Sequence, residues 1–214
     1  LDPAFFDMLI VPQHDRVRGD NVIVTKAALN RINQSQIAAS ANNVPQQWQE
    51  AASPRVAVMI GGDNRRYKIS NDMATHMAQQ LAAFAATNNA NLFLVASQRC
   101  PDNVLKYLQT QLPTNRCMIA TNEQPNPYPG ILTMADAVIV TSDSVNMVSE
   151  AASTGKPVLI AYWRTEVGRI AKFHQTMQHG KHTAPLTERL PAGPFVPLDE
   201  SAKIRQQISA RLAH

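Results

Sequence analysis

Cysteine is scarce in this chain, long apolar runs are missing, and aromatic side chains make up only 6% of its 214 residues. The two cysteines, Cys100 and Cys117, lack the paired spacing of a zinc site, so we expect reduced, partly buried thiols in a cytoplasmic protein. No run of about 18 apolar residues suggests a membrane span. Strips of interleaved basic and aromatic residues, which mark nucleic-acid surfaces, are also missing, and we expect no nucleic-acid partner.

Excess charge is small as well. Twenty Lys and Arg against sixteen Asp and Glu give a formal net charge of +4, which suits an anionic ligand or the surface of an anionic membrane. A hydrophobic share of 44% and a charged share of 17% are typical of a globular domain with a sizeable core. We therefore expect a cytoplasmic protein that can associate peripherally with the inner membrane.

Apolar, β-branched runs alternate with helical patterns along most of the chain. A helix is clearest at 72–86, where methionine, leucine and phenylalanine recur every three or four residues. Segments 33–53 and 180–197 show little periodicity and are interpreted as a linker and a surface loop. We expect strands at 5–11, 21–25, 55–60, 91–96, 117–120, 137–140 and 157–162. The alternation among the last five predicts an α/β fold, a Rossmann-like parallel sheet with helices on both faces.

The stretch 136–160 combines a strand, a polar turn, a helix and a second strand. Ser142, Asp143 and Ser144 form the turn, at the start of the predicted helix. Free N–H groups and the helix dipole attract anions there, and a serine hydroxyl can also contact a phosphate. Ser142, Asp143 and Ser144 are therefore candidate phosphate-binding residues. The alternative is that these serines only cap an ordinary helix.

A fixed pattern, E-x-x-x-x-G-x-P, follows the turn. Glu150 lies inside the predicted helix, Gly155 ends it, and Pro157 opens the next strand. A helix of this length can hold a carboxylate at ribose distance from an anion bound at its N-terminus. The pattern therefore favours a nucleotide site over a simple cap.

A second loop with suitable residues follows the predicted strand at 55–60. Gly61 and Gly62 allow a ligand to approach the backbone, and Arg65 and Arg66 supply positive charge for a diphosphate. Because the carboxyl ends of parallel strands share one edge, this loop and the serine turn are expected to close on the same crevice. The alternative is a simple turn.

These two loops resemble the C-terminal, donor-binding domain of GT-B glycosyltransferases, including the lipid-linked N-acetylglucosaminyltransferases of peptidoglycan synthesis. The resemblance implies that Glu150 holds the ribose of a UDP-sugar, with Ser142 and Ser144 near its phosphates. It also implies that Asn126 and Tyr128 lie beside the nucleotide base. Binding of this kind needs no metal and no cofactor, and His174, His179 and His182 share no helical face with a carboxylate.

A broader resemblance covers nearly the whole chain. Segments 11–25, 60–70 and 126–157 are similar to the mitochondrial-fission Elm-type family, whose bacterial members carry the label of nucleoside-diphosphate-sugar epimerases. Neither G-x-x-G-x-x-G nor Y-x-x-x-K, the signatures of dehydrogenase-type epimerases, is present. The resemblance implies 1–53 as a remnant of an N-terminal domain with a linker, 54–198 as the nucleotide-sugar domain, and 199–214 as a helix crossing back. The chain also begins without methionine, and we expect the trailing part of a longer protein.

A charged loop follows the first predicted strand. His14 or Asp15 is a candidate base, and Arg16 and Arg18 are candidate clamps for an acceptor or another anion. The alternative is a solvated loop without function.

The leading hypothesis is a GT-B-like glycosyltransferase or sugar-nucleotide-binding protein, with a UDP-type donor and a membrane-surface or lipid-linked acceptor. Two alternatives stay open. One is a non-catalytic scaffold of the same fold that recruits a partner. The other is a sugar-nucleotide epimerase of the UDP-GlcNAc 2-epimerase type.

Overall fold

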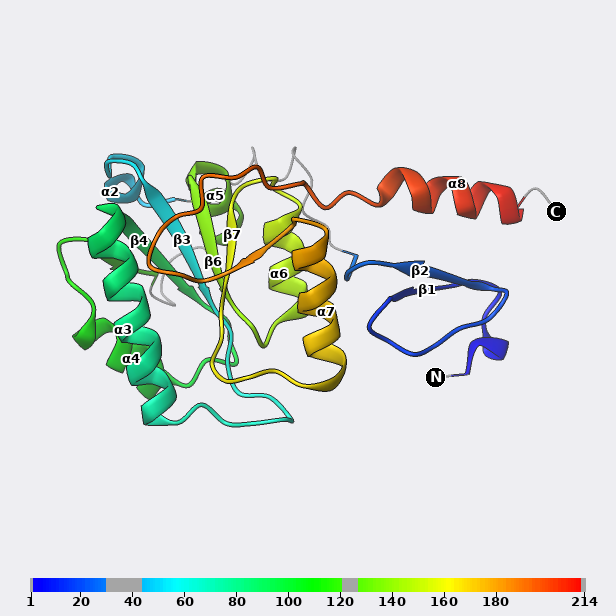
Figure 1. Ribbon diagram of the computed structural model, residues 1–214, viewed down its shortest axis with the longest axis horizontal. Helices are drawn as coiled ribbons and strands as arrows, with labels where there is room; N and C mark the ends of the chain where they lie inside the picture. The colour runs from blue at the N-terminus through cyan, green and yellow to red at the C-terminus, as the bar shows by residue number, and fades with distance from the viewer. Residues whose placement is uncertain (1, 30–43, 121–126, 213–214) are drawn as a thin grey trace.

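Two parallel sheets organise the residues that the computed structural model describes, 2–29, 44–120 and 127–212 (Figure 1). The larger has the strand order β5-β4-β3-β6-β7-β8, with every neighbouring pair parallel. Its strands are β3 (Arg55–Ile60), β4 (Asn91–Ala96), β5 (Cys117–Ile119), β6 (Ala137–Thr141), β7 (Val158–Ala161) and β8 (Ala184–Pro185). This order makes β3 and β6 the neighbours at which the winding of the sheet reverses, and it confirms the predicted Rossmann-like fold.

Helices cover both faces of this sheet. Along β3, Val56, Val58 and Ile60 join the core beneath α3 and α4, whereas Ala57 and Met59 join the core beneath α5, α6 and α7. Alternation of this kind is expected for a strand buried on both faces. The covering helices are α2 (Gln46–Gln49), α3 (Asn71–Asn88), α4 (Asp102–Gln111), α5 (Tyr128–Met134), α6 (Val145–Ala152) and α7 (Gly168–His179).

The structure corrects the sequence prediction at three places. The run at 5–11 is not one strand, because Asp2 caps a 3-10 turn, η1 (Pro3–Phe5), before β1 (Leu9–Pro12) begins. The predicted loop at 180–197 contains β8, which extends the sheet beside β7 but is too short to show periodicity. Helix α7 was not predicted. Of the predicted linker, residues 33–43 lie outside the described part, and the remainder contains α2.

The smaller sheet consists of β1 and β2 (Val22–Thr25), which pair in parallel. The chain returns to it at the end, where α8 (Ser201–Leu212) lies beside β2 (Figure 1). Lys203 Nζ and Arg211 Nη2 each lie 3.4 Å from a β2 carbonyl oxygen. The last helix therefore contacts the first part of the chain, while the division into segments 1–53, 54–198 and 199–214 stays a prediction.

Candidate functional site

The carboxyl ends of β3 and β6 bring the two predicted loops together. The Gly61 amide donates to Thr141 Oγ1 at 2.7 Å, and the Gly62 amide donates to Asp143 Oδ2 at 3.1 Å. In open α/β sheets this edge, at the reversal of strand order, is where ligands bind. The glycine loop and the serine turn are thus in direct contact at this edge of the sheet, while their role as the walls of a ligand crevice stays a prediction.

Asp143 is the centre of this site. Its side chain is fully buried, and its carboxylate also accepts from Thr141 Oγ1 at 2.7 Å, Trp163 Nε1 at 3.2 Å and Arg99 Nη2 at 3.3 Å. A buried carboxylate needs such donors, because an unpaired buried charge is costly. The side chain therefore serves the protein's own donors and does not fill the place among phosphate ligands that the sequence suggested for Asp143.

Close approach explains both glycines. A Cβ on Gly61 would lie 2.2 Å from the Asp143 carboxylate oxygens, and one on Gly62 would lie 2.0 Å from the carbonyl oxygen of Arg99. Both distances are far inside van der Waals contact. Both positions require glycine because the Asp143 side chain and the Arg99 backbone occupy the space that a Cβ would need. A simple turn would not impose this requirement.

A second buried carboxylate, Glu166, lies after β7. Its side chain is 4% exposed and accepts from Ser142 Oγ at 3.0 Å and Tyr67 Oη at 3.4 Å, and it forms an ion pair with Arg66. On the other side of the turn, His174 Nε2 lies 2.9 Å from the carbonyl oxygen of Ser142. The hydroxyl and carbonyl of Ser142 are thus both occupied within the protein.

Helix α6 begins directly after Ser144 and carries Glu150. The Ser144 hydroxyl accepts from the Met147 amide at 3.5 Å, so this serine caps the helix. Farther along, Glu150 accepts a hydrogen bond from the Tyr128 hydroxyl. Burial raises the pKa of the Glu150 carboxyl, and the Tyr128 hydrogen bond partly opposes this shift. Two residues predicted on the nucleoside side are thus in contact, while Asn126 lies outside the described residues.

Arginines surround these groups. Arg65 is exposed, and the guanidinium carbons of Arg66 and Arg164 each lie 5.4 Å from the centre of the Tyr67 ring. Arg99, which follows β4, was missed by the sequence prediction. It belongs to no motif, and only the rule that parallel strand ends share one edge could have indicated it.

The charged loop after β1 lines a separate cavity of about 920 Å³, together with the start of α7. Arg16 and Arg18 line it from the loop, and Gly168 and Arg169 line it from α7. Arg18 donates to three backbone carbonyls of its own loop, at 2.6 to 3.0 Å. Asp15 forms an ion pair with Arg169 at 3.0 Å, which ties the loop to α7.

His14, in the same loop, faces α7. Its ring contacts the Phe173 ring edge-on, with centres 5.3 Å apart, and burial lowers the pKa of its imidazole. The two candidate bases therefore differ in their suitability: Asp15 is paired with Arg169, whereas His14 favours its neutral form. A neutral imidazole is the form that a general base requires.

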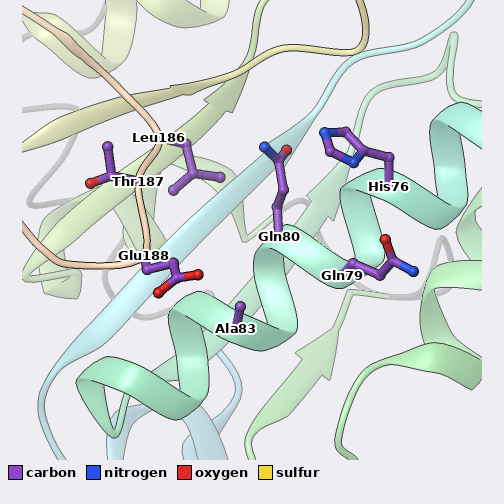
Figure 2. A pocket seen from close by; sticks show the side chains of 7 residues that line it. All are labelled: His76, Gln79, Gln80, Ala83, Leu186, Thr187 and Glu188. Carbon is purple, nitrogen blue, oxygen red and sulfur yellow. The ribbon is translucent and has the colours of Figure 1, made fainter.

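Another cavity, of about 330 Å³, lies between α3 and the segment after β8 (Figure 2). The side chains of His76 and Gln80 project from α3 on the side that carries this segment. The cavity is lined by His76, Gln79, Gln80, Ala83, Leu186, Thr187 and Glu188. It shares no residue with the site at β3 and β6.

Within the described residues, no helix combines the length and apolar character that crossing a membrane requires. Over the same residues, no group of three or more His, Cys, Asp and Glu side chains is placed to hold a metal ion.

Comparison with solved structures gives weak likenesses. The forosaminyltransferase SpnP of spinosyn synthesis shares 18% identity with a TM-score of 0.48, over 96% of this chain and 46% of that enzyme. The glycosyltransferase VinC, solved with dTDP, shares 20% identity with a TM-score of 0.39, over 80% of this chain and 36% of VinC. Neither likeness identifies a ligand for this chain.

Sequence relatives are closer. Mitochondrial fission protein ELM1 of Arabidopsis thaliana is 27% identical over 96% of this chain and 55% of its own length. Uncharacterized protein RP120 of Rickettsia prowazekii is 31% identical over 70% of this chain and 43% of its own length, so the chain spans about half the length of the curated relatives it matches. The family model described as Mitochondrial fission ELM1 matches residues 1–212, and the chain therefore belongs to the mitochondrial fission ELM1 family.

Proposed function

We propose that the chain binds a nucleoside-diphosphate sugar of the UDP type, as the donor-binding part of a GT-B-like glycosyltransferase. The observation that carries this proposal is the meeting of the Gly61–Gly62 loop with the start of α6, at the reversal point of the sheet. Backbone donors, a helix dipole and several arginines meet at this edge. Together they suit a diphosphate.

The phosphates would lie against the first turn of α6. Ser144 caps this helix, and the start of a helix favours anions. Arg65 and Arg66 approach from the loop after β3, and Arg65 is exposed. The ligand would thus contact the first turn of α6 and the arginines, since the Ser142 hydroxyl and the Asp143 carboxylate are held inside.

The ribose would lie beside Glu150. This residue is six positions beyond Ser144, which corresponds to roughly 9 Å along a helix axis. Its bond from Tyr128 uses one carboxylate oxygen, and the other oxygen can accept from ribose hydroxyls. Asn126 keeps its proposed place at the base through the sequence resemblance alone.

The cavity near β1 would receive the acceptor. Arg16, Arg18 and Arg169 outnumber the single carboxylate of Asp15 there, which favours an anionic group such as the phosphate of a lipid-linked acceptor. Phe5 and Val167 lie in the segments that line the cavity, and they are 83% and 67% exposed. Exposed apolar residues beside arginines suit an anionic membrane surface. His14 is the candidate base for deprotonating the acceptor.

Isothermal titration with UDP and with UDP-sugars tests the donor site. We expect micromolar binding to the unmodified chain and a loss of roughly tenfold or more in Glu150→Gln, the size of one charged hydrogen bond. Glu188→Gln is the matched control, because Glu188 is an exposed glutamate outside the site. Absence of heat with every ligand, together with an unchanged melting temperature, would remove the nucleotide proposal.

A second candidate function is a non-catalytic scaffold. Two observations favour it: the Gly62 amide and the Ser142 hydroxyl already have partners inside the protein, and the Arabidopsis relative is named for mitochondrial fission. This candidate predicts no nucleotide affinity. A sugar-nucleotide epimerase would instead bind the UDP-sugar and isomerise it without any acceptor, which NMR of the product sugar would detect.

A further inference from the structure

Two buried carboxylates lie where the proposed diphosphate would bind. Asp143 and Glu166 are 0% and 4% exposed at their side chains, and both are close to the start of α6. Negative charge repels a phosphate, so their presence calls for a reason. Each is paired with one arginine, Asp143 with Arg99 and Glu166 with Arg66.

The two arginines differ from their partners in exposure. The side chains of Arg66 and Arg99 are 35% and 47% exposed, so each contacts a buried carboxylate and is also partly open to solvent. A guanidinium has five N–H donors, and the pairing uses only part of them. The remaining donors are available to a ligand while the buried pairing holds the guanidinium in place.

Both arginines also converge on one residue. Asp143 Oδ2 accepts from Arg99 Nη2 at 3.3 Å and from the Gly62 amide at 3.1 Å, and the Asp143 carbonyl oxygen lies 3.5 Å from Arg66 Nη2. Asp143 immediately precedes Ser144, the cap of α6. The two guanidinium groups therefore approach the start of α6 from two different loops.

We propose that Arg66 and Arg99 form a clamp for the diphosphate of the ligand, and that Glu166 and Asp143 act as positioning residues for it. Arg99 is thereby assigned to the binding site. The clamp rests on the proposed function for its nucleotide, but its own chemistry requires only two linked phosphates. Orientation by a fixed carboxylate reduces the entropy that an arginine loses on binding, and arginine suits bidentate contact with phosphate oxygens.

The test compares inorganic pyrophosphate, UDP and uridine in titrations of the unmodified chain and of four variants. Arg99→Ala is expected to weaken pyrophosphate and UDP roughly 10- to 100-fold, the range for one charged hydrogen bond, and to leave uridine unchanged. The affinity of Arg99→Lys for pyrophosphate should lie between that of the unmodified chain and that of Arg99→Ala, because lysine keeps the charge but lacks the planar guanidinium. Arg189→Ala is the control, because Arg189 lies far from the clamp. Its neighbour Leu190 donates a hydrogen bond to Asn88 at the end of α3, which precedes the amino end of β4.

Glu166→Gln tests the positioning role. We expect weaker pyrophosphate binding although a negative charge has been removed, because Arg66 loses its fixed partner. Tighter binding would mean that the carboxylate only repels the ligand, and would overturn its role. A structural defect would affect uridine and UDP alike.

The outcomes separate the clamp from the proposed function. UDP binding that is equal in Arg99→Ala and the unmodified chain overturns the clamp and leaves the donor site standing. Pyrophosphate binding that depends on Arg99, with no affinity for UDP, supports the clamp and removes the uridine nucleotide. Binding of neither ligand by the unmodified chain overturns both.

Discussion

Gly62 shows how little room single residues have at the centre of this site. Its amide bonds Asp143, and the position of its missing Cβ is filled by the Arg99 carbonyl at 2.0 Å. Backbone cannot move aside as the end of a side chain can. The close packing joins the loop after β3 to the loop after β4 at the backbone of Arg99, one of the two arginines of the proposed clamp.

Gly62→Ala is therefore expected to lower the free energy of unfolding by about 1 to 3 kcal/mol, the usual cost of forcing an extra carbon into a packed region. Urea denaturation followed by circular dichroism measures it. Gly193→Ala is the control, since a Cβ at Gly193 would meet no heavy atom within 4 Å. Equal stability of the two variants would contradict the packing described here.

His174 makes stability depend on pH. It is 2% exposed, its Nε2 faces a carbonyl and so carries the proton, and its Nδ1 has no partner among the described residues. Burial lowers the pKa of His174 below its ordinary value of 6.5. The unfolded chain then binds more protons than the folded chain as pH falls below 6.5, so stability decreases in that window.

We expect the free energy of unfolding of the unmodified chain to fall between pH 7.5 and 5, and to fall less steeply in His174→Gln. Some dependence should persist in the variant, because burial also lowers the pKa of His14. Denaturation series at several pH values give both slopes. Parallel slopes would show that His174 keeps an ordinary pKa in the folded protein.

Sequence patterns indicated part of the candidate site at this scale. Motif spacing indicated Gly61, Gly62, Ser144 and Glu150, because each of them also has a local structural role. Arg99 stands outside any motif, since its role arises only when three strand ends meet. For Asp143, residue type and position indicated the site but not that the carboxylate turns inward.

Helix α5 illustrates how an element is held. Carbonyls at its C-terminal end accept from Lys156 Nζ, with Leu132 O of the helix and Ala135 O of the C-cap each at 2.6 Å. A lysine at this end also interacts favourably with the helix dipole. Because α5 begins at Tyr128, the partner of Glu150, Lys156 supports the nucleoside side of the site from a distance.

Lys156→Met is expected to cost about 1 to 3 kcal/mol of stability, because several carbonyls at the end of α5 lose a charged donor. It should also weaken UDP binding through a displaced Tyr128. Lys106→Met, at an exposed position on α4, is the control for removing a lysine. Thermal unfolding and titration of both variants provide the comparison, and identical melting temperatures would exclude the capping role.

Elements with strong periodicity were predictable, and short or irregular ones were not. Strands β3 and β4 have the bounds that the sequence predicted, since long apolar runs between helices leave few alternatives. Strand β8 has two residues, which is too few for a pattern. Phe5, the last residue of η1, was taken for the start of a strand because it opens an apolar run, although no residue of η1 is buried.

At the scale of the whole molecule, the two sheets differ in how much apolar core packs against them. The larger sheet has core clusters on both faces, whereas β1 and β2 form a pair with two free edges among the described residues. Two-stranded sheets are marginally stable alone. Outside the pair, α8 contacts β2, and α7 contacts the loop after β1 through Arg169 and Asp15.

The amide exchange rates of the two sheets are therefore expected to differ. Amides of β1 and β2 are expected to exchange through local opening, at lower free energies than amides of β3 and β6, which should exchange only on global unfolding. Peptide-resolved mass spectrometry can follow both sheets in one sample. Equal protection would show instead that the chain opens as one cooperative unit.

The hydrogen bond from Trp163 to Asp143 gives the molecule a built-in optical reporter. The chain has two tryptophans, and the other, Trp48, is buried and stacked on Phe93, with ring centres 5.0 Å apart. Indole emission is sensitive to a neighbouring charge. A diphosphate bound to the remaining donors of Arg99 would place new negative charge near Trp163 and shift its emission wavelength, while the emission of Trp48 stays constant. Binding could thus be followed without any label.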